Sequence, residues 1–96
     1  MNIQQEKAGN TGRFYIEENN KTIAELDYQL NDRTLVVLHT EVDESLEGKG
    51  VGKELVAAAV DYVRNNDLRI NATCPYAKKI LDRTKEFADV YNPEKK

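Results

Sequence analysis

The chain has 96 residues, 40% of them hydrophobic and 32% charged, which is the size and composition of a single folded domain. Its 14 lysines and arginines against 17 aspartates and glutamates give a net charge of −3, which argues against a surface built to coat nucleic acid or an anionic membrane. One cysteine excludes an internal disulfide, no cluster of cysteines and histidines suits zinc, and without a signal-like or membrane-spanning apolar run we expect a cytoplasmic protein.

The first half of the sequence predicts an antiparallel sheet. Residues 1–12 are polar, and we expect a loosely held lead-in there with room for a short edge strand. Residues 14–16 are strand formers, and residues 23–30 alternate between apolar and polar side chains, as a strand with one buried face does. Residues 34–42 begin as a continuous apolar run. Because turn-forming asparagines and aspartates separate these segments, we expect three strands in a meander.

The second half predicts a helix, a short strand and a last helix. Apolar residues recur at helical spacing between about residues 50 and 64, and residues 68–73 are the expected strand. Pro75 favours the start of the last helix, because proline is tolerated at a first helical position. A strand, a helix and a second strand in this order form a βαβ unit with parallel strands.

The expected fold class is therefore α/β (α+β), an antiparallel meander followed by one parallel βαβ unit and a C-terminal helix. We expect three segments along the chain, a polar lead-in at 1–12, one folded domain at 13–91 and a charged tail at 92–96.

Candidate site residues gather at one edge of this predicted sheet. Parallel strands end at the same edge, and ligands of open α/β sheets usually bind there. The strand before the helix ends in His39, Thr40, Glu41 and Val42. The strand after the helix runs into Cys74, and the glycine-rich turn opens onto the same edge.

The glycine-rich segment at residues 48–52 leads directly into the helix. Helix N-termini present unpaired N–H groups and partial positive charge, and glycines allow the backbone to approach a phosphate closely. Lys49 and Lys53 add positive charge. The segment does not match a P-loop, because Glu54 stands where serine or threonine is required, or the dinucleotide fingerprint, because Lys53 occupies its third glycine. The alternative is a merely flexible helix start, which has no use for three glycines.

These motifs resemble the GNAT N-acetyltransferase superfamily. Its acetyl-CoA loop has the signature Gln/Arg-x-x-Gly-x-Gly/Ala at the start of a helix, and this chain has Glu47-Gly48-Lys49-Gly50-Val51-Gly52. His39-Thr40-Glu41-Val42 and Cys74-Pro75-Tyr76 are similar to motifs of a minimal, single-domain bacterial-type branch. The resemblance covers about residues 13–91. Glu47 departs from the signature and puts a negative charge near the expected pyrophosphate.

The resemblance implies an acetyl-CoA-dependent N-acetyltransferase that uses no metal. It implies that acetyl-CoA binds through the loop and the strand end, at Thr40, Glu41, Val42, Gly48, Lys49, Gly50, Val51, Gly52 and Lys53. Cys74 and His39 are the catalytic candidates, Cys74 as an acyl acceptor and His39 as a base or proton relay. The resemblance leaves open which amine accepts the acetyl group, and whether transfer is direct or passes through acetyl-Cys74.

Each candidate residue also has a structural interpretation. Cysteine is often a small buried hydrophobe, and His39 can bond to neighbouring backbone at a strand end. Glu41 can be a solvated charge, and Tyr76 can pack against the core rather than protonate a leaving thiolate. A non-catalytic acyl-CoA-binding or regulatory module would need the glycine loop but neither Cys74 nor His39. A protein-interaction domain without a ligand leaves the three glycines unexplained.

Overall fold

The computed structural model describes residues 2–91. The helices and strands follow in chain order: β1 (Gln4–Ala8), β2 (Thr11–Glu18), β3 (Lys21–Asn31), β4 (Thr34–Val42), the 3-10 turn η1 (Glu44–Leu46), α1 (Val51–Asn65), β5 (Arg69–Ala72), α2 (Pro75–Arg83) and the 3-10 turn η2 (Lys85–Phe87). No helix within residues 2–91 is long and apolar enough to cross a membrane.

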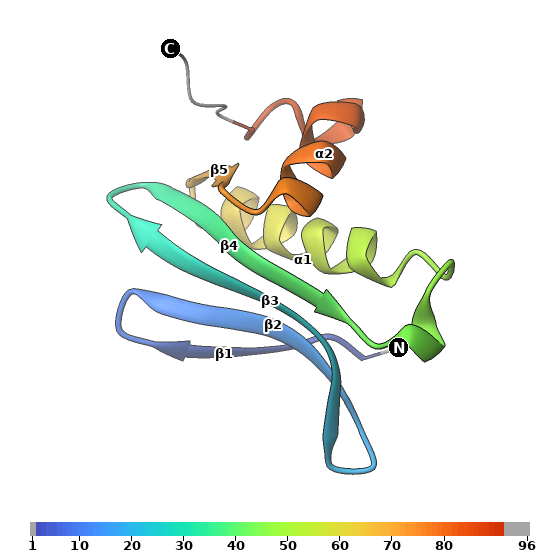
Figure 1. Cartoon of the computed structure of the whole chain (residues 1–96). Coiled ribbons are helices and arrows are strands. Elements are labelled where there is room, and N and C mark those ends of the chain that lie inside the picture. Colours follow the sequence, from blue (N-terminus) through green and yellow to red (C-terminus); the bar gives the residue numbers. More distant parts are fainter. Residues whose placement is uncertain (1, 92–96) are drawn as a thin grey trace.

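The five strands form one sheet in the order β1-β2-β3-β4-β5 (Figure 1). The first four pair antiparallel, and β5 pairs parallel to β4. The predicted fold class, a meander followed by one βαβ unit and a helix, is therefore confirmed. Within the predicted lead-in, residues 4–8 form the edge strand β1, whose side chains are all exposed and whose strand character rests on pairing with β2.

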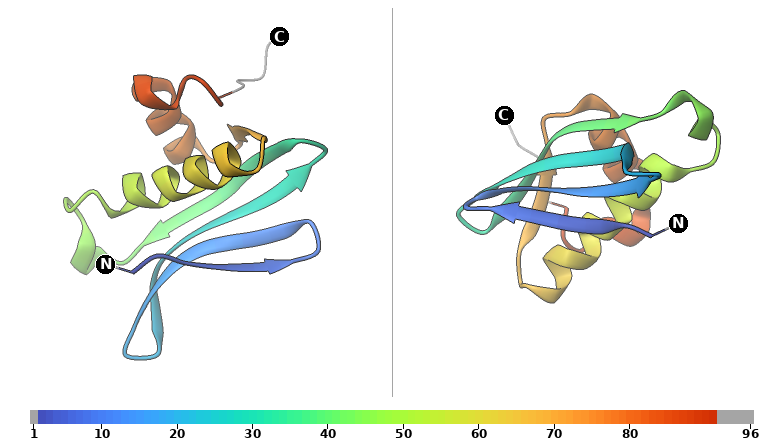
Figure 2. Two further views of the ribbon diagram at one scale, coloured as in Figure 1. Left: turned by 180° about the vertical axis from the view of Figure 1, so that it is seen from behind. Right: turned by 90° about the horizontal axis from the view of Figure 1, so that it is seen from below.

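Both helices lie on the same side of the sheet, and the other side is open in the described part of the chain (Figure 2). This arrangement follows from the alternation of β2, β3 and β4, whose apolar residues point toward α1. The apolar stripe of α1 packs on them. In the segment after α2, Phe87 and Val90 are also buried. The largest fully buried side chains are Tyr28, Leu26, Leu35, Leu55, Ile70, Leu81, Val37, Val56, Val60 and Val63.

The pairing of β4 with β5 stops at Val37, and this opens the sheet at one edge. The register runs from Thr34 to Val37, and beyond it the backbone N–H groups of Thr73 and Cys74 both donate to the Val37 carbonyl, at 3.0 and 3.2 Å. On its other side β4 has a bulge, where the register skips Leu38. Among residues 2–91, the last residues of β4 therefore continue past β5 without a strand partner on that side.

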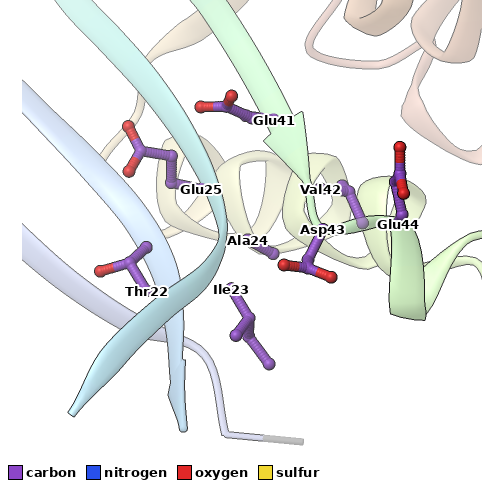
Figure 3. A pocket seen from close by; sticks show the side chains of 8 residues that line it. All are labelled: Thr22, Ile23, Ala24, Glu25, Glu41, Val42, Asp43 and Glu44. Atoms are coloured by element: carbon purple, nitrogen blue, oxygen red, sulfur yellow. The ribbon is translucent and has the colours of Figure 1, made fainter.

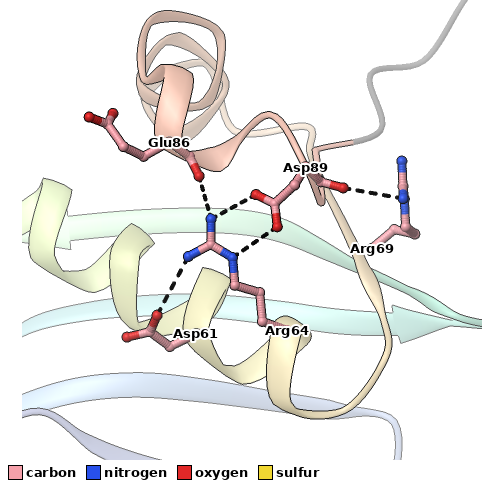
Figure 4. Close-up of polar contacts among 5 residues, drawn as sticks. All are labelled: Asp61, Arg64, Arg69, Glu86 and Asp89. Atoms are coloured by element: carbon pink, nitrogen blue, oxygen red, sulfur yellow. Dashed lines mark hydrogen bonds and ion pairs between the residues drawn. The ribbon is translucent and has the colours of Figure 1, made fainter.

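A charged contact fastens the end of the described chain to α1 (Figure 4). Two guanidinium nitrogens of Arg64 donate to the Asp89 carboxylate, at 3.1 and 2.7 Å. Arg64 also donates to the Glu86 carbonyl and lies 3.9 Å from Asp61. Arg69 donates to the Asp89 carbonyl at 3.3 Å. These bonds hold the segment after α2 against the C-terminal end of α1.

We expect Asp89→Asn to lower the melting temperature near neutral pH. The hydrogen bond from Arg64 holds the pKa of Asp89 below its usual range, so this carboxylate stabilises the fold above pH 3.8 and loses its contribution as pH falls through its folded pKa. The deficit of the variant should therefore shrink toward about pH 3. Thermal unfolding at both pH values measures it. Asp32→Asn, an equal charge change in the exposed turn after β3, is the control and should leave the neutral melting temperature unchanged. An equal deficit at both pH values would contradict the electrostatic explanation.

Candidate functional site

Two of the loop glycines adopt a backbone conformation that other residues rarely take. Gly48 has φ of 79° and Gly50, the N-cap of α1, has φ of 73°. A Cβ at either position would meet open space, so the requirement is conformational rather than steric. These two glycines turn the chain from η1 into α1.

At the third loop position, Gly52, glycine is required for a steric reason rather than a conformational one. It lies in the first turn of α1, it is buried, and its φ is not positive. A Cβ built on Gly52 would collide with the ring and hydroxyl of Tyr76, from the first turn of α2. The missing side chain at Gly52 therefore leaves the space that the Tyr76 ring occupies, and Tyr76 is still 48% exposed.

The N-terminus of α1 has free donors. The first bond of the helix runs from the Glu54 N–H to the Gly50 carbonyl, at 3.1 Å. The N–H groups of Val51, Gly52 and Lys53 make no backbone hydrogen bond within residues 2–91, and Gly50 has no side chain to cap them. Such an end carries about half a positive charge and accepts anions.

A pocket of about 460 Å³, the glycine-loop pocket, lies between this helix end and the end of β4. It brings together six of the residues that the resemblance implied for acetyl-CoA, and it adds Leu46, Glu47 and Tyr76. Glu41, Lys49 and Lys53 do not line it. The lining residues are Thr40, Val42, Leu46, Glu47, Gly48, Gly50, Val51, Gly52 and Tyr76.

Cys74 adjoins this pocket through Thr40. The thiol is 8% exposed and lies at the N-cap of α2, where Pro75 begins the helix. Its Sγ donates a hydrogen bond to the Thr40 hydroxyl, at 3.6 Å. Sequence reasoning named Thr40 only as an acetyl-CoA-binding residue and missed this contact, which depends on how far β4 and β5 diverge.

His39 lies on the opposite face of the sheet from Thr40. His39 pairs with Asp27 on β3, whereas Thr40 pairs with the fully buried Leu26 on the helix-covered face. The His39 side chain is 59% exposed, and its Nε2 is 3.8 Å from the Glu41 carboxylate. The structure therefore does not bring the two catalytic candidates, Cys74 and His39, together on one face.

The open face carries a cluster of neighbouring charged side chains. Burial, first, and then a hydrogen bond with Glu25 and the negative charge of Glu25 raise the pKa of Asp27 to about 6. The charges of His39 and Arg13 act in the opposite direction. Arg13 bridges Glu6 at 2.9 Å and Glu25 at 3.1 Å. The alternation of residues 23–30 places Glu25 and Asp27 on the polar face, which is the signal in the sequence that could have revealed this group.

A second, acidic hollow of about 360 Å³ lies between the start of β3 and the end of β4 (Figure 3). It shares one lining residue, Val42, with the glycine-loop pocket. Four carboxylates and no basic residue line it, and sequence reasoning did not anticipate it. The lining residues are Thr22, Ile23, Ala24, Glu25, Glu41, Val42, Asp43 and Glu44. Within residues 2–91, no group of three or more histidines, cysteines and acidic residues is placed to hold a metal ion.

The sequence matches a known family. The family model described as GCN5-related N-acetyl-transferase covers residues 13–90. Protein NATD1 of Bos taurus is 41% identical over 59 residues, which are 60% of this chain and 52% of that protein. Protein NATD1 of Homo sapiens is 40% identical over 59 residues, with the same shares. The chain thus matches about half the length of these curated relatives.

Solved structures share the fold. The solution structure of a GCN5-like protein from Staphylococcus aureus has a TM-score of 0.76 and 34% identity, over 98% of this chain and 92% of that one. The ribosomal-protein-S18-alanine N-acetyltransferase of Escherichia coli has a TM-score of 0.64 at 16% identity, over 79% and 52%. The aminoglycoside N-acetyltransferase AAC(6')-Iy, solved in complex with CoA, has a TM-score of 0.63 at 14% identity, over 84% and 87%.

We expect Asp27→Asn to stabilise the protein at alkaline pH. Because the folded pKa of Asp27, about 6, lies above its ordinary 3.8, its favourable contribution is complete below 3.8 and lost as pH rises through 6. Asparagine keeps a donor for Glu25 without the charge. After allowance for solvent screening the gain is about 1 kcal/mol at pH 8, and it disappears near pH 4. Urea unfolding at the two pH values measures it, and a variant no more stable than wild type at pH 8 would refute the assignment.

Proposed function

We infer the function of this chain from two observations, its family and its glycine-loop pocket. The chain belongs to the GCN5-related N-acetyltransferases. We propose that it binds acetyl-CoA in that pocket and transfers the acetyl group to an amine. The observation that carries the proposal is that an uncapped helix N-terminus and an unpaired strand end form two walls of one pocket.

The loop and the strand end suit different parts of acetyl-CoA. The free N–H groups of Val51, Gly52 and Lys53 hold the pyrophosphate, with exposed Lys49 and Lys53 adding positive charge beside it. The backbone of residues 40–42 pairs with the pantetheine arm as an added strand, in the place that β5 leaves after Val37. The thioester then lies near Thr40 and Cys74.

Cys74 supplies a covalent route. Its sulfur attacks the thioester carbonyl carbon, a new S–C bond forms, and the bond from that carbon to the CoA sulfur breaks. The proton lost by the Cys74 thiol balances the proton taken up by the departing CoA thiolate. A neutral amine then attacks acetyl-Cys74, loses a proton, and regenerates the thiol.

His39 and the acidic hollow suit the acceptor. His39 lies on the open face of β4, where an imidazole can accept the proton that the attacking amine loses. The carboxylates of Glu25, Glu41, Asp43 and Glu44 attract a cationic amine to the same end of β4. In direct transfer, the amine reaches the thioester from this face, and Cys74 has no covalent role.

We expect acetyl-CoA to shift the backbone amide signals of residues 40–42, 48–53 and 74 in ¹⁵N-labelled protein. Gly50→Ala should weaken binding several-fold, because alanine at a φ of 73° distorts the loop. Gly9→Ala is the matched control, since Gly9 has φ of 64°, also faces open space, and lies in the distant turn between β1 and β2. Both variants should lose about 1 kcal/mol of stability, but only Gly50→Ala should lose affinity. Absence of shifts at millimolar acetyl-CoA would refute the proposal.

The second experiment separates an enzyme from a binding module. With a panel of amines, wild type should release CoA thiol from acetyl-CoA, and Cys74→Ala should lower that rate by at least tenfold if the covalent route operates. Intact mass should then show one acetyl group on wild type and none on Cys74→Ala. His39→Gln should lower release by both routes. Binding without any release would identify a non-catalytic acyl-CoA-binding module.

A further inference from the structure

The Thr40 hydroxyl lies where the pocket and the cysteine meet. Thr40 belongs to the stretch of β4 beyond Val37, and it lines the glycine-loop pocket. Cys74 comes from the other side of the opening, between β5 and α2. The 3.6 Å contact between their side chains is the one hydrogen bond of the Cys74 sulfur within residues 2–91.

The register of β4 excludes the other polar side chains of this strand from that role. Thr40 faces the helices, because its partner is the buried Leu26, whereas His39 and Glu41 pair with Asp27 and Glu25 on the open face. A thiol that is 8% exposed therefore has a hydroxyl, and not an imidazole or a carboxylate, as its neighbour.

We propose that Thr40 is a positioning residue that holds the Cys74 sulfur beside the pocket and stabilises it as a thiolate; this rests on the proposed function. A hydroxyl is suited to both states of the sulfur. It accepts a hydrogen bond from the thiol, and after rotation about its C–O bond it donates one to the thiolate. A carbonyl or an ionised carboxylate can only accept. The N-terminus of α2 adds partial positive charge at the same sulfur.

Thr40 takes no proton in the acyl step. The thiol proton of Cys74 leaves to solvent and is balanced by the proton that the CoA thiolate takes up, while the Thr40 hydroxyl keeps its own proton throughout. When the sulfur becomes a thioester it no longer needs a donor, so the hydroxyl is released toward the pocket.

Alkylation of Cys74 by iodoacetamide tests the role without any need for acetyl-CoA. Thr40→Val keeps the branched shape and removes the hydroxyl, and we expect it to slow alkylation by about fivefold near neutral pH, the worth of one hydrogen bond. Its rate profile should be displaced toward higher pH. Thr40→Ser restores the hydroxyl and should react within about twofold of wild type. Thr73→Val is the control, because Thr73 precedes Cys74 but its hydroxyl donates to the Val37 carbonyl, at 3.5 Å.

Wild-type rates in Thr40→Val, or equally slow rates in Thr40→Ser and Thr40→Val, would overturn the proposal. The same variants are then mixed with acetyl-CoA, and acetyl-Cys74 formation should follow the order of alkylation. If wild type takes no acetyl group while alkylation still follows the hydroxyl, the positioning role is supported and the covalent step of the proposed function is overturned. Amide spectra of each variant confirm that the fold is intact.

Discussion

The early end of the β4–β5 pairing is the constraint on which the site depends. One carbonyl, that of Val37, accepts the N–H groups of both Thr73 and Cys74, so the chain turns away from β4 immediately after the last paired residue. Full pairing would fill the edge of β4 with β5 and remove the space beside Thr40. It would also carry Cys74 along the strand instead of placing it at the start of α2. The pocket and the position of the thiol therefore have one cause.

The sheet divides the proposed chemistry between its two faces. The helix-covered face holds the uncapped end of α1, the hydroxyl of Thr40 and the buried thiol. The open face holds His39 together with Glu25 and Glu41, two of the carboxylates that line the second hollow. Because neighbouring residues of a strand point to opposite faces, the two adjacent residues His39 and Thr40 are enough to place a base on one face and a hydroxyl on the other. Transfer through the opening between β4 and β5 is the arrangement that uses both.

Periodicity and turn residues predicted the sheet, the βαβ unit and the loop, because these depend on local pattern. The conformations of Gly48 and Gly50 follow from the same local reasoning. The need for glycine at position 52 does not, since it comes from the ring of Tyr76 in a different helix. The contact between Thr40 and Cys74 was likewise beyond the sequence, because it depends on the divergence of two strands. Strand β1 has no buried side chain to give it a hydrophobic pattern. Pairing with β2 is what makes it a strand.

The open face limits how an acceptor can be recognised. No helix covers it in the described part of the chain, so an acceptor there keeps much of its water and binds through charge more than through enclosure (Figure 2). Charge alone also holds an amine as a cation, which cannot attack a thioester. The neighbouring imidazole of His39 therefore matters as much as the carboxylates, since a base must remove the proton that the carboxylates stabilise. Attraction and activation of the amine thus need opposite chemistry, and the contact of His39 with Glu41 places a base directly beside one of the carboxylates.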